Sequence, residues 1–180
     1  MGAFTPFLGL NIFVLFKCYL RGNSKHMAVI KEGSKAPAFK GVDQNGKTVA
    51  LADYKGQKVV LYFYPKDDTP GCTAQACNLR DNYKALQKKG LQFLGVSVDS
   101  VKSHEKFVEK YDLPFSLVAD EDKKIVDKYN LWGQKKFMGK TYMGTTRTTF
   151  LIDEAGMVQH IIEKPDTKDH TKEILAISGW

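Results

Sequence analysis

The spacing of apolar residues predicts an α/β fold, in which helices flank a central mixed β-sheet. Three runs rich in β-branched and aromatic residues predict buried strands, at residues 58–64, 91–98 and 148–152. Helical patterns separate these runs, so strands and helices alternate along the chain. Gly156 follows the third run and predicts a hairpin to a further strand at residues 157–162.

Four segments carry apolar residues at helical spacing. In the longest, residues 72–89, apolar side chains recur every three or four residues and Gly90 ends the helix. Shorter helices are expected at residues 101–111, 123–129 and 169–177, the last with Asp169 as its N-cap. Because no linker or repeat follows residue 30, residues 27–180 are expected to form one domain.

The first 26 residues differ from the rest of the chain. Residues 3–16 are nearly all apolar, yet this stretch is shorter than the roughly 18 residues that a membrane-spanning helix needs. Met27 opens a stretch that is typical of an ordinary protein start. We therefore expect residues 1–26 to be an N-terminal extension outside the fold, and we expect no membrane contact.

Composition excludes several classes of protein. With 43% hydrophobic and 26% charged residues, the chain of 180 residues is globular rather than disordered. The net charge of +7 comes from bases that are interspersed with acids, which indicates a solvated surface rather than a nucleic-acid interface. Three cysteines are too few for a disulfide-stapled secreted scaffold, so a reducing compartment, the cytoplasm, is expected.

The chemically informative segment is residues 64–73, which leaves a buried strand, turns through Pro and Gly, and enters a helix at Cys72. The free N–H groups and partial positive charge of a helix N-terminus favour a thiolate over a thiol. Thr69, three residues earlier, can turn its hydroxyl toward the sulfur and an incoming oxygen. Cys72 could instead be a small buried hydrophobic residue. The flanking Pro-Thr-Pro-Gly geometry and a second cysteine favour the nucleophile.

The second cysteine, Cys77, lies five residues after Cys72. On an intact α-helix this offset places the two Cα atoms about 8.6 Å apart. A disulfide requires a separation below about 6.8 Å. The two cysteines can therefore pair only if the start of the helix unwinds; the alternative is that Cys77 is merely packed on the helix.

The run at residues 62–77, YFYPKDDTPGCTAQAC, resembles the peroxiredoxins, in particular the bacterioferritin-comigratory or Q class. Pro65, Thr69 and Cys72 match the Pro-x-x-x-Thr-x-x-Cys motif of that family. The resemblance covers about residues 28–177, through GSKAPAF, GVSVDS, LWGQKKFMGKTYMG and RTTFLID. It implies a thioredoxin-like fold and a thiol peroxidase that reduces hydrogen peroxide and organic hydroperoxides in antioxidant defence.

The resemblance also implies roles for individual residues. Cys72 would be the peroxidatic cysteine, and Cys77 would resolve its sulfenic acid as an intramolecular disulfide. Arg147 would point at the catalytic sulfur, and Gln75, one helical turn past Cys72, could orient it. No metal or organic cofactor is required. Thioredoxin or a similar dithiol would reduce the disulfide, and a bridge within one chain would allow a monomer.

Three other functions fit the sequence less well than a peroxidase does. A metal-binding module lacks clustered ligands, because the histidines are dispersed, at His26, His104, His160 and His170. A dithiol oxidoreductase acting on protein disulfides usually has Cys-x-x-Cys spacing, which is absent here. A non-catalytic binding protein with the same fold would not need Thr69, Cys72 and Arg147 together. The apolar stretch at residues 131–142, with Trp132, Phe137 and Met138, is expected to pack in the core; the alternative is that it shapes the preference among hydroperoxides.

Overall fold

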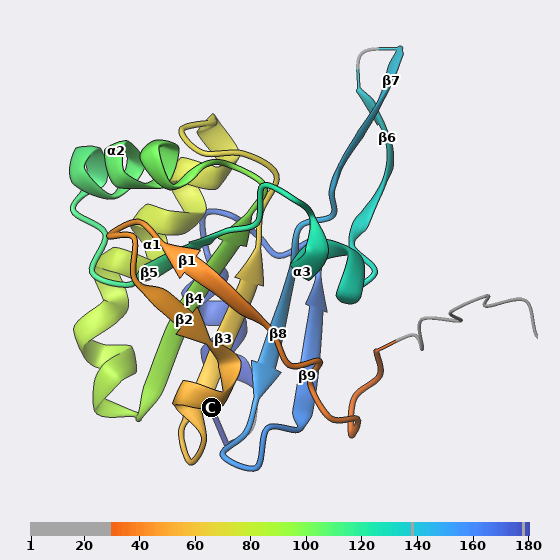
Figure 1. The fold of residues 1–180 in the computed structure, drawn as a ribbon. Helices are drawn as coiled ribbons and strands as arrows, with labels where there is room; N and C mark the ends of the chain where they lie inside the picture. Colours follow the sequence, from red (N-terminus) through yellow and green to blue (C-terminus); the bar gives the residue numbers. More distant parts are fainter. Residues whose placement is uncertain (1–29, 138, 178) are drawn as a thin grey trace, which may run out of the picture.

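The computed structural model describes residues 30–137, 139–177 and 179–180. Within them, seven strands form one sheet in the order β2-β1-β5-β4-β3-β8-β9, and β6 and β7 form a two-stranded ribbon (Figure 1). The strands are β1 (Lys40–Asp43), β2 (Thr48–Ala50), β3 (Lys58–Phe63), β4 (Leu91–Ser97), β5 (Ser116–Ala119), β6 (Trp132–Phe137), β7 (Lys140–Thr145), β8 (Thr148–Ile152) and β9 (Val158–Glu163). The helices are α1 (Pro70–Lys88), α2 (Val101–Tyr111), α3 (Lys124–Lys128) and α4 (His170–Ala176), with a 3-10 turn at Leu51–Tyr54.

The sheet is mixed, as the sequence predicts. Strand β3 lies parallel to β4 and antiparallel to β8, and β4 is in turn parallel to β5. Strand β9 completes the expected hairpin with β8. Because β3 and β4 are parallel, the chain must cross back between them, and α1 makes this connection. The start of α1 therefore lies at the carboxyl end of β3.

Each face of the sheet carries a hydrophobic core. Alternate residues of β3 point to opposite faces, which explains why its sequence is apolar throughout. Val59, Leu61 and Phe63 join the core under α3. Val60 and Tyr62 join the core under α1, α2 and α4.

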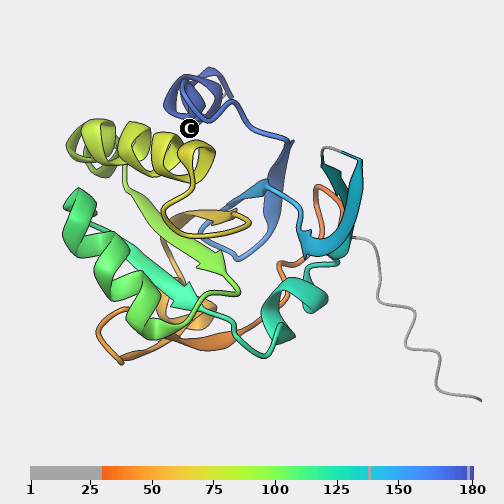
Figure 2. The ribbon, with the colours of Figure 1, turned by 90° about the horizontal axis from the view of Figure 1, so that it is seen from above.

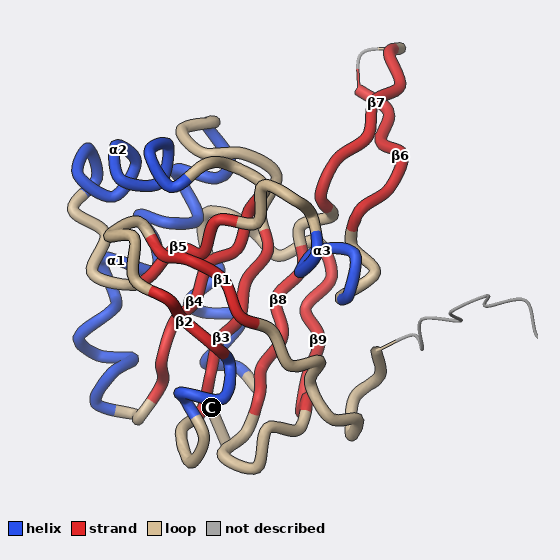
Figure 3. The backbone as a smooth tube through the Cα atoms, in the orientation of Figure 1, coloured by secondary structure: helices blue, strands red, loops and turns tan. Residues whose placement is uncertain are grey.

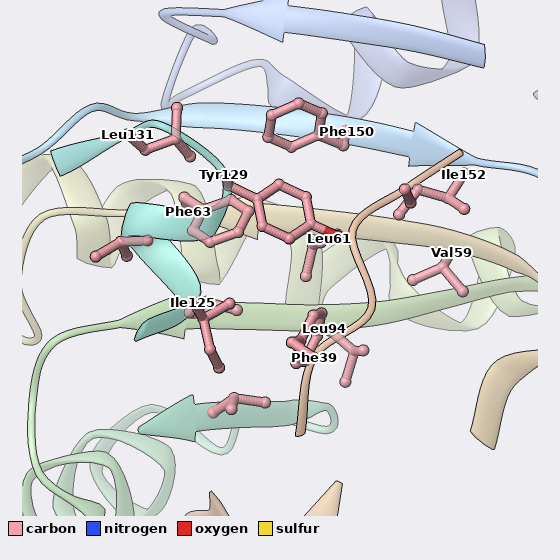
Figure 4. Packing of buried hydrophobic residues seen from close by; sticks show 14 of the residues in the cluster. Phe39, Val59, Leu61, Phe63, Leu94, Ile125, Tyr129, Leu131, Phe150 and Ile152 are labelled. Carbon is pink, nitrogen blue, oxygen red and sulfur yellow. The ribbon is translucent and has the colours of Figure 1, made fainter. Parts of the chain in front are cut away.

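The core on the α3 side is built around aromatic contacts (Figure 4). The ring of Tyr129 lies 4.9 Å from that of Phe63 and 5.1 Å from that of Phe150. Ile125 of α3 packs on the same cluster. These contacts fix the short α3 against β3 and β8, the two strands that lead to the candidate site.

The predicted long elements are confirmed, with ends that differ by two residues or fewer. Gly90, at φ +79°, follows the end of α1 as expected. Strands β1, β2 and β5 were not predicted, because each has only three or four residues and shows no clear period. Asp169 is the N-cap residue of α4, but its side chain makes no capping hydrogen bond.

The interpretation of residues 131–142 as core is wrong for most of the stretch that the structure describes. Leu131 is buried and Trp132 packs partly on the core. Beyond them the chain forms the β6–β7 ribbon, which projects from the body (Figure 3). Tyr142 and Met143 are 51% and 53% exposed on this ribbon. A two-stranded ribbon has no second layer to cover its faces, so apolar side chains on it stay in contact with solvent.

The prediction that residues 1–26 lie outside the fold concerns residues outside the described ones. In the described ranges, none of the helices has both the length and the apolar character that crossing a bilayer requires.

Candidate active site

The candidate site forms where the chain leaves β3 and enters α1. Thr69 is the N-cap residue of α1, with extended backbone, and Pro70 occupies the first helical position. Proline is favoured there because its fixed φ suits the helix and its missing N–H would have no helical acceptor. The first helical bond runs from Thr73 N to Thr69 O, over 2.8 Å. Cys72 therefore lies in the first turn, next to unpaired N–H groups and the positive end of the helix dipole.

Arg147 reaches this turn from a neighbouring strand. It directly precedes β8, whose first residue, Thr148, pairs with Phe63 at the end of β3. The antiparallel register thus brings Arg147, 75 residues away in sequence, beside the start of α1. Its Nη2 donates to Cys72 Sγ over 3.1 Å. The guanidinium lies close to Gly71 as well, where a Cβ would stand 3.5 Å from Nη2.

Gln75 holds the guanidinium in place. Arg147 Nη1 donates to Gln75 Oε1 over 2.5 Å, which confirms the expected contact. Gln75 is fully buried and Cys72 is 3% exposed. Because burial removes competing water, a guanidinium fixed by two contacts interacts strongly with a negative sulfur. The arrangement places a fixed cation within hydrogen-bond distance of the buried sulfur of Cys72.

Two of the predicted site residues, Thr69 and Pro65, make no hydrogen bond to the sulfur of Cys72. The Thr69 hydroxyl donates to the main-chain oxygen of Lys66 over 3.1 Å rather than turning to the sulfur as expected. A hydroxyl has a single proton, so Thr69 in this rotamer can offer the sulfur or a ligand only an acceptor. Pro65 is half-buried at the end of β3 and shapes the loop without a polar group of its own.

Cys77 lies on the same unbroken helix as Cys72. Both are free thiols, Cys72 buried and Cys77 partly exposed. With α1 continuous from Pro70 to Lys88, helix geometry keeps their Cα atoms about 8.6 Å apart. The structure thus shows both cysteines as free thiols, in the reduced form.

Asp67 anchors the loop between β3 and α1 to helix α2. This contact was not predicted from the sequence. The buried carboxylate of Asp67 accepts hydrogen bonds from Tyr64 Oη and Ser103 Oγ, both over 2.7 Å. His104 Nδ1 lies 2.8 Å from the same carboxylate, and His104 is fully buried. Burial, and next the charge of Asp67, raise the pKa of Tyr64 well above its ordinary value. These contacts fix the loop onto α2.

A signal for this cluster was present in the sequence. The helical pattern at residues 101–111 places His104 on the apolar side, and a buried imidazole needs a polar partner. Nothing in the sequence shows that the partner is Asp67, 37 residues earlier.

No group of three or more possible metal ligands occurs within residues 30–137, 139–177 and 179–180. Of the histidines considered as ligands, His104 pairs with Asp67, His160 with Glu32 and His170 with Glu173. The described histidines thus serve separate carboxylates.

The sequence of this chain matches a known protein family. Residues 33–161 match the AhpC/TSA family. Peroxiredoxin Bcp of Escherichia coli is 46% identical over 149 residues, which cover 83% of this chain and 96% of that protein. Peroxiredoxin Bcp of Bacillus subtilis is 46% identical over 146 residues, covering 81% and 93%.

A solved structure agrees with these matches. The bacterioferritin comigratory protein of Xanthomonas campestris, described for its alkyl peroxide reduction activity, superposes with a TM-score of 0.71 at 34% identity. The superposition covers 77% of this chain and 88% of that one. The predicted thioredoxin-like fold is therefore confirmed. On these matches, and with Cys72 at the expected helix start, the chain belongs to the AhpC/TSA family and is a peroxiredoxin, a thiol peroxidase of the Bcp and Q type.

Proposed function

We propose that this chain reduces hydrogen peroxide and organic hydroperoxides with Cys72 as the peroxidatic nucleophile. The observation that carries the proposal is the 3.1 Å contact between Arg147 Nη2 and Cys72 Sγ at the N-terminus of α1. The alkyl peroxide reduction described for the Xanthomonas campestris relative supports organic hydroperoxides as one substrate class.

In the first step the thiolate of Cys72 attacks the terminal peroxide oxygen. An S–O bond forms as the O–O bond breaks, so the sulfur becomes a sulfenic acid and an alkoxide or hydroxide leaves. The leaving oxygen takes up a proton and departs as an alcohol or water. Arg147 and the main-chain N–H groups of the first turn of α1 stabilise the charge that develops on the two oxygens. Thr69 and Pro65 shape the loop against which the peroxide binds.

In the second step Cys77 attacks the sulfenic sulfur of Cys72. An S–S bond forms, the S–O bond breaks, and the hydroxyl leaves with the thiol proton as water. Because α1 keeps the two residues too far apart, its first turns must unwind before this attack. The two-electron oxidation is then stored as an intramolecular disulfide.

In the third step an external dithiol, which we propose to be thioredoxin, reduces the disulfide by exchange and becomes a disulfide itself. Since the bridge lies within one chain, the cycle needs no second copy, and we propose a monomer. A dithiol-dependent cycle suits a reducing compartment, and we propose the cytoplasm. Fractionation of cells that produce the protein would check this location.

Mass spectrometry after one equivalent of hydrogen peroxide tests the scheme. Trypsin cleaves after Lys66 and Arg80, so one peptide, residues 67–80, carries Cys72 and Cys77 and excludes Cys18. The expected product is this peptide with two hydrogens lost. Cys72→Ser should abolish peroxide consumption. Cys77→Ser should give one turnover and leave added oxygen on Cys72.

Other products would revise or end the proposal. A stable sulfenic or sulfinic acid on Cys72 of the unsubstituted protein, with Cys77 still free, would remove the intramolecular step and keep the nucleophile. Full peroxidase activity in Cys72→Ser would overturn the scheme.

A further inference from the structure

Asn78, the residue directly after Cys77, joins α1 to the C-terminal helix α4. Its Nδ2 donates to the main-chain oxygen of Lys168 over 2.7 Å. Its Oδ1 accepts hydrogen bonds from Thr171 N and Thr171 Oγ1, both over 2.8 Å. Since Asp169 makes no side-chain cap, Asn78 supplies from another helix the acceptor that an N-cap residue normally provides. Figure 2 shows α4 lying beside α1.

The next two residues fix α1 on other sides. Leu79 is fully buried in the core between α1 and the sheet. Arg80 Nη1 donates to the main-chain oxygen of Tyr111, at the end of α2, over 2.8 Å. Asn78, Leu79 and Arg80 together form what we call the helix clamp. One turn of α1 is thereby held by α4, the core and α2.

The eight residues before the clamp include the buried Cys72, Gln75 and Ala76, but their side chains make no hydrogen bond to α2 or α4. In the described part of the chain, the side-chain hydrogen bonds of residues 70–77 are those of Cys72 and Gln75 to Arg147. The segment begins with Pro70 and Gly71, and glycine favours the unfolded chain over a helix. One of the two contacts depends on the sulfur that oxidation changes. The side-chain hydrogen bonds that join α1 to α2 and α4 therefore begin at Asn78.

We propose that Asn78 is a positioning residue for the resolving step, which sets where the unwinding of α1 stops. This inference rests on the proposed disulfide between Cys72 and Cys77. Residues 70–77 leave the helix, while the clamp holds α1 from Asn78 onward and with it the main chain next to Cys77. Five unwound Cα steps can span about 17 Å, so Cys72 can reach the roughly 5.5 Å that a bridge needs. Because the main chain next to Cys77 is held in place, the sulfur of Cys72 has a smaller volume to search before it meets that of Cys77.

The hydrogen bonds of an α-helix make the limit measurable. Each N–H bonds to the oxygen four residues earlier, so amides 78–81 lose their acceptors when residues 70–77 unwind. The amide of Asn82, whose acceptor is the Asn78 oxygen, is the first that keeps its bond. In the disulfide form of the unsubstituted protein, exchange protection should therefore begin at Asn82.

The test is amide hydrogen exchange by NMR on the reduced and the peroxide-oxidised full chain. In the oxidised Asn78→Ala variant, amides 82–85 should exchange at least about fivefold faster, the factor that corresponds to one hydrogen bond of about 1 kcal/mol. Thr171→Val removes the hydroxyl that donates to Asn78. In its oxidised form, too, amides 82–85 should exchange faster, so that exchange protection begins later in α1 than Asn82. The double variant should add little to Asn78→Ala, because the Thr171 hydroxyl acts through the Asn78 side chain.

Asn82→Ala is the matched control. Asn82 lies one turn later on α1, and its side chain bonds to the Asn78 oxygen within the helix, not to α4. This variant should keep the limit of protection where the unsubstituted protein has it. Thr171→Val keeps the experiment decisive if Asn78→Ala does not fold.

Two outcomes overturn the inference and are distinguishable. If the peptide of residues 67–80 carries the disulfide in Asn78→Ala and Thr171→Val, yet protection still begins at Asn82, the clamp does not set the limit and the proposed function stands. If the unsubstituted protein forms no such disulfide, the mass map shows it before any exchange is measured, and the resolving step and the clamp fail together.

Discussion

At the scale of single residues, the site depends on the guanidinium of Arg147, which two hydrogen bonds hold in position. Arg147 contacts the sulfur with one nitrogen of its guanidinium and Gln75 with another. A planar fork of donors can make both contacts at once, whereas an ammonium group cannot hold the same geometry. The buried Gln75 accordingly serves as the support that keeps Arg147 on Cys72.

Arg147→Lys tests this geometry, because it keeps the positive charge and removes the fork. The second-order rate of peroxide reduction should fall about 100-fold, the typical cost of losing one fixed donor to a developing negative oxygen. Stopped-flow measurement of the first turnover would give this rate, and the thermal midpoint should change little. A rate within twofold of the unsubstituted protein would show that charge alone suffices.

At the scale of elements, the start of α1 is held by its neighbours and not by its own sequence. Strand β8 supplies Arg147, the loop before α1 is anchored on α2 through Asp67, and α4 receives its cap from Asn78. Between β8 and α4 lies His170, with Thr149 on one ring nitrogen and Glu173 on the other, each 3.0 Å away. Because His170 is buried in this junction, we expect the packing of α4 to depend on pH.

Burial lowers the pKa of His170 below its ordinary value, against the opposing effect of Glu173. The unfolded chain therefore binds a proton at a higher pH than the folded one does, and stability falls as pH drops below about 6.5. Urea unfolding at pH 7.5 and 5.5 should show this loss, and His170→Gln should reduce it. An equal loss in the variant would assign the acid sensitivity to other groups.

At the scale of the whole molecule, the seven-stranded sheet has a core on each face and carries the site at the carboxyl end of its interior strand β3. The relatives from Escherichia coli and Bacillus subtilis align with 83% and 81% of this chain, over almost their full length. We propose that residues 27–180 form a single peroxiredoxin domain and that residues 1–26 are an extension outside it.

A chain that starts at Met27 tests this division. If residues 1–26 are an extension outside the domain, as proposed, this chain should keep the thermal midpoint within about 2 °C. Its rate of peroxide reduction should equal that of the full chain under the same conditions. A lower midpoint together with a lower rate would place part of residues 1–26 within the folded domain.

The sequence by itself determined what depends on neighbours along the chain. The apolar run of β3, the Pro-Gly turn and the helical spacing after Cys72 act over a few residues, so they were readable without coordinates. The short strands β1, β2 and β5 were not, because a segment of three or four residues becomes a strand only through its pairing in the sheet.

The tertiary structure alone decided which distant side chains meet. The contact of Arg147 with Cys72 was expected from family resemblance, but its geometry follows from the pairing of β8 with β3. The partners of Asp67 on α2 and of Asn78 on α4 lie tens of residues away and were not expected at all. The physical reason is that local patterns fix the type of each element, whereas contacts between elements depend on the order and register of the sheet.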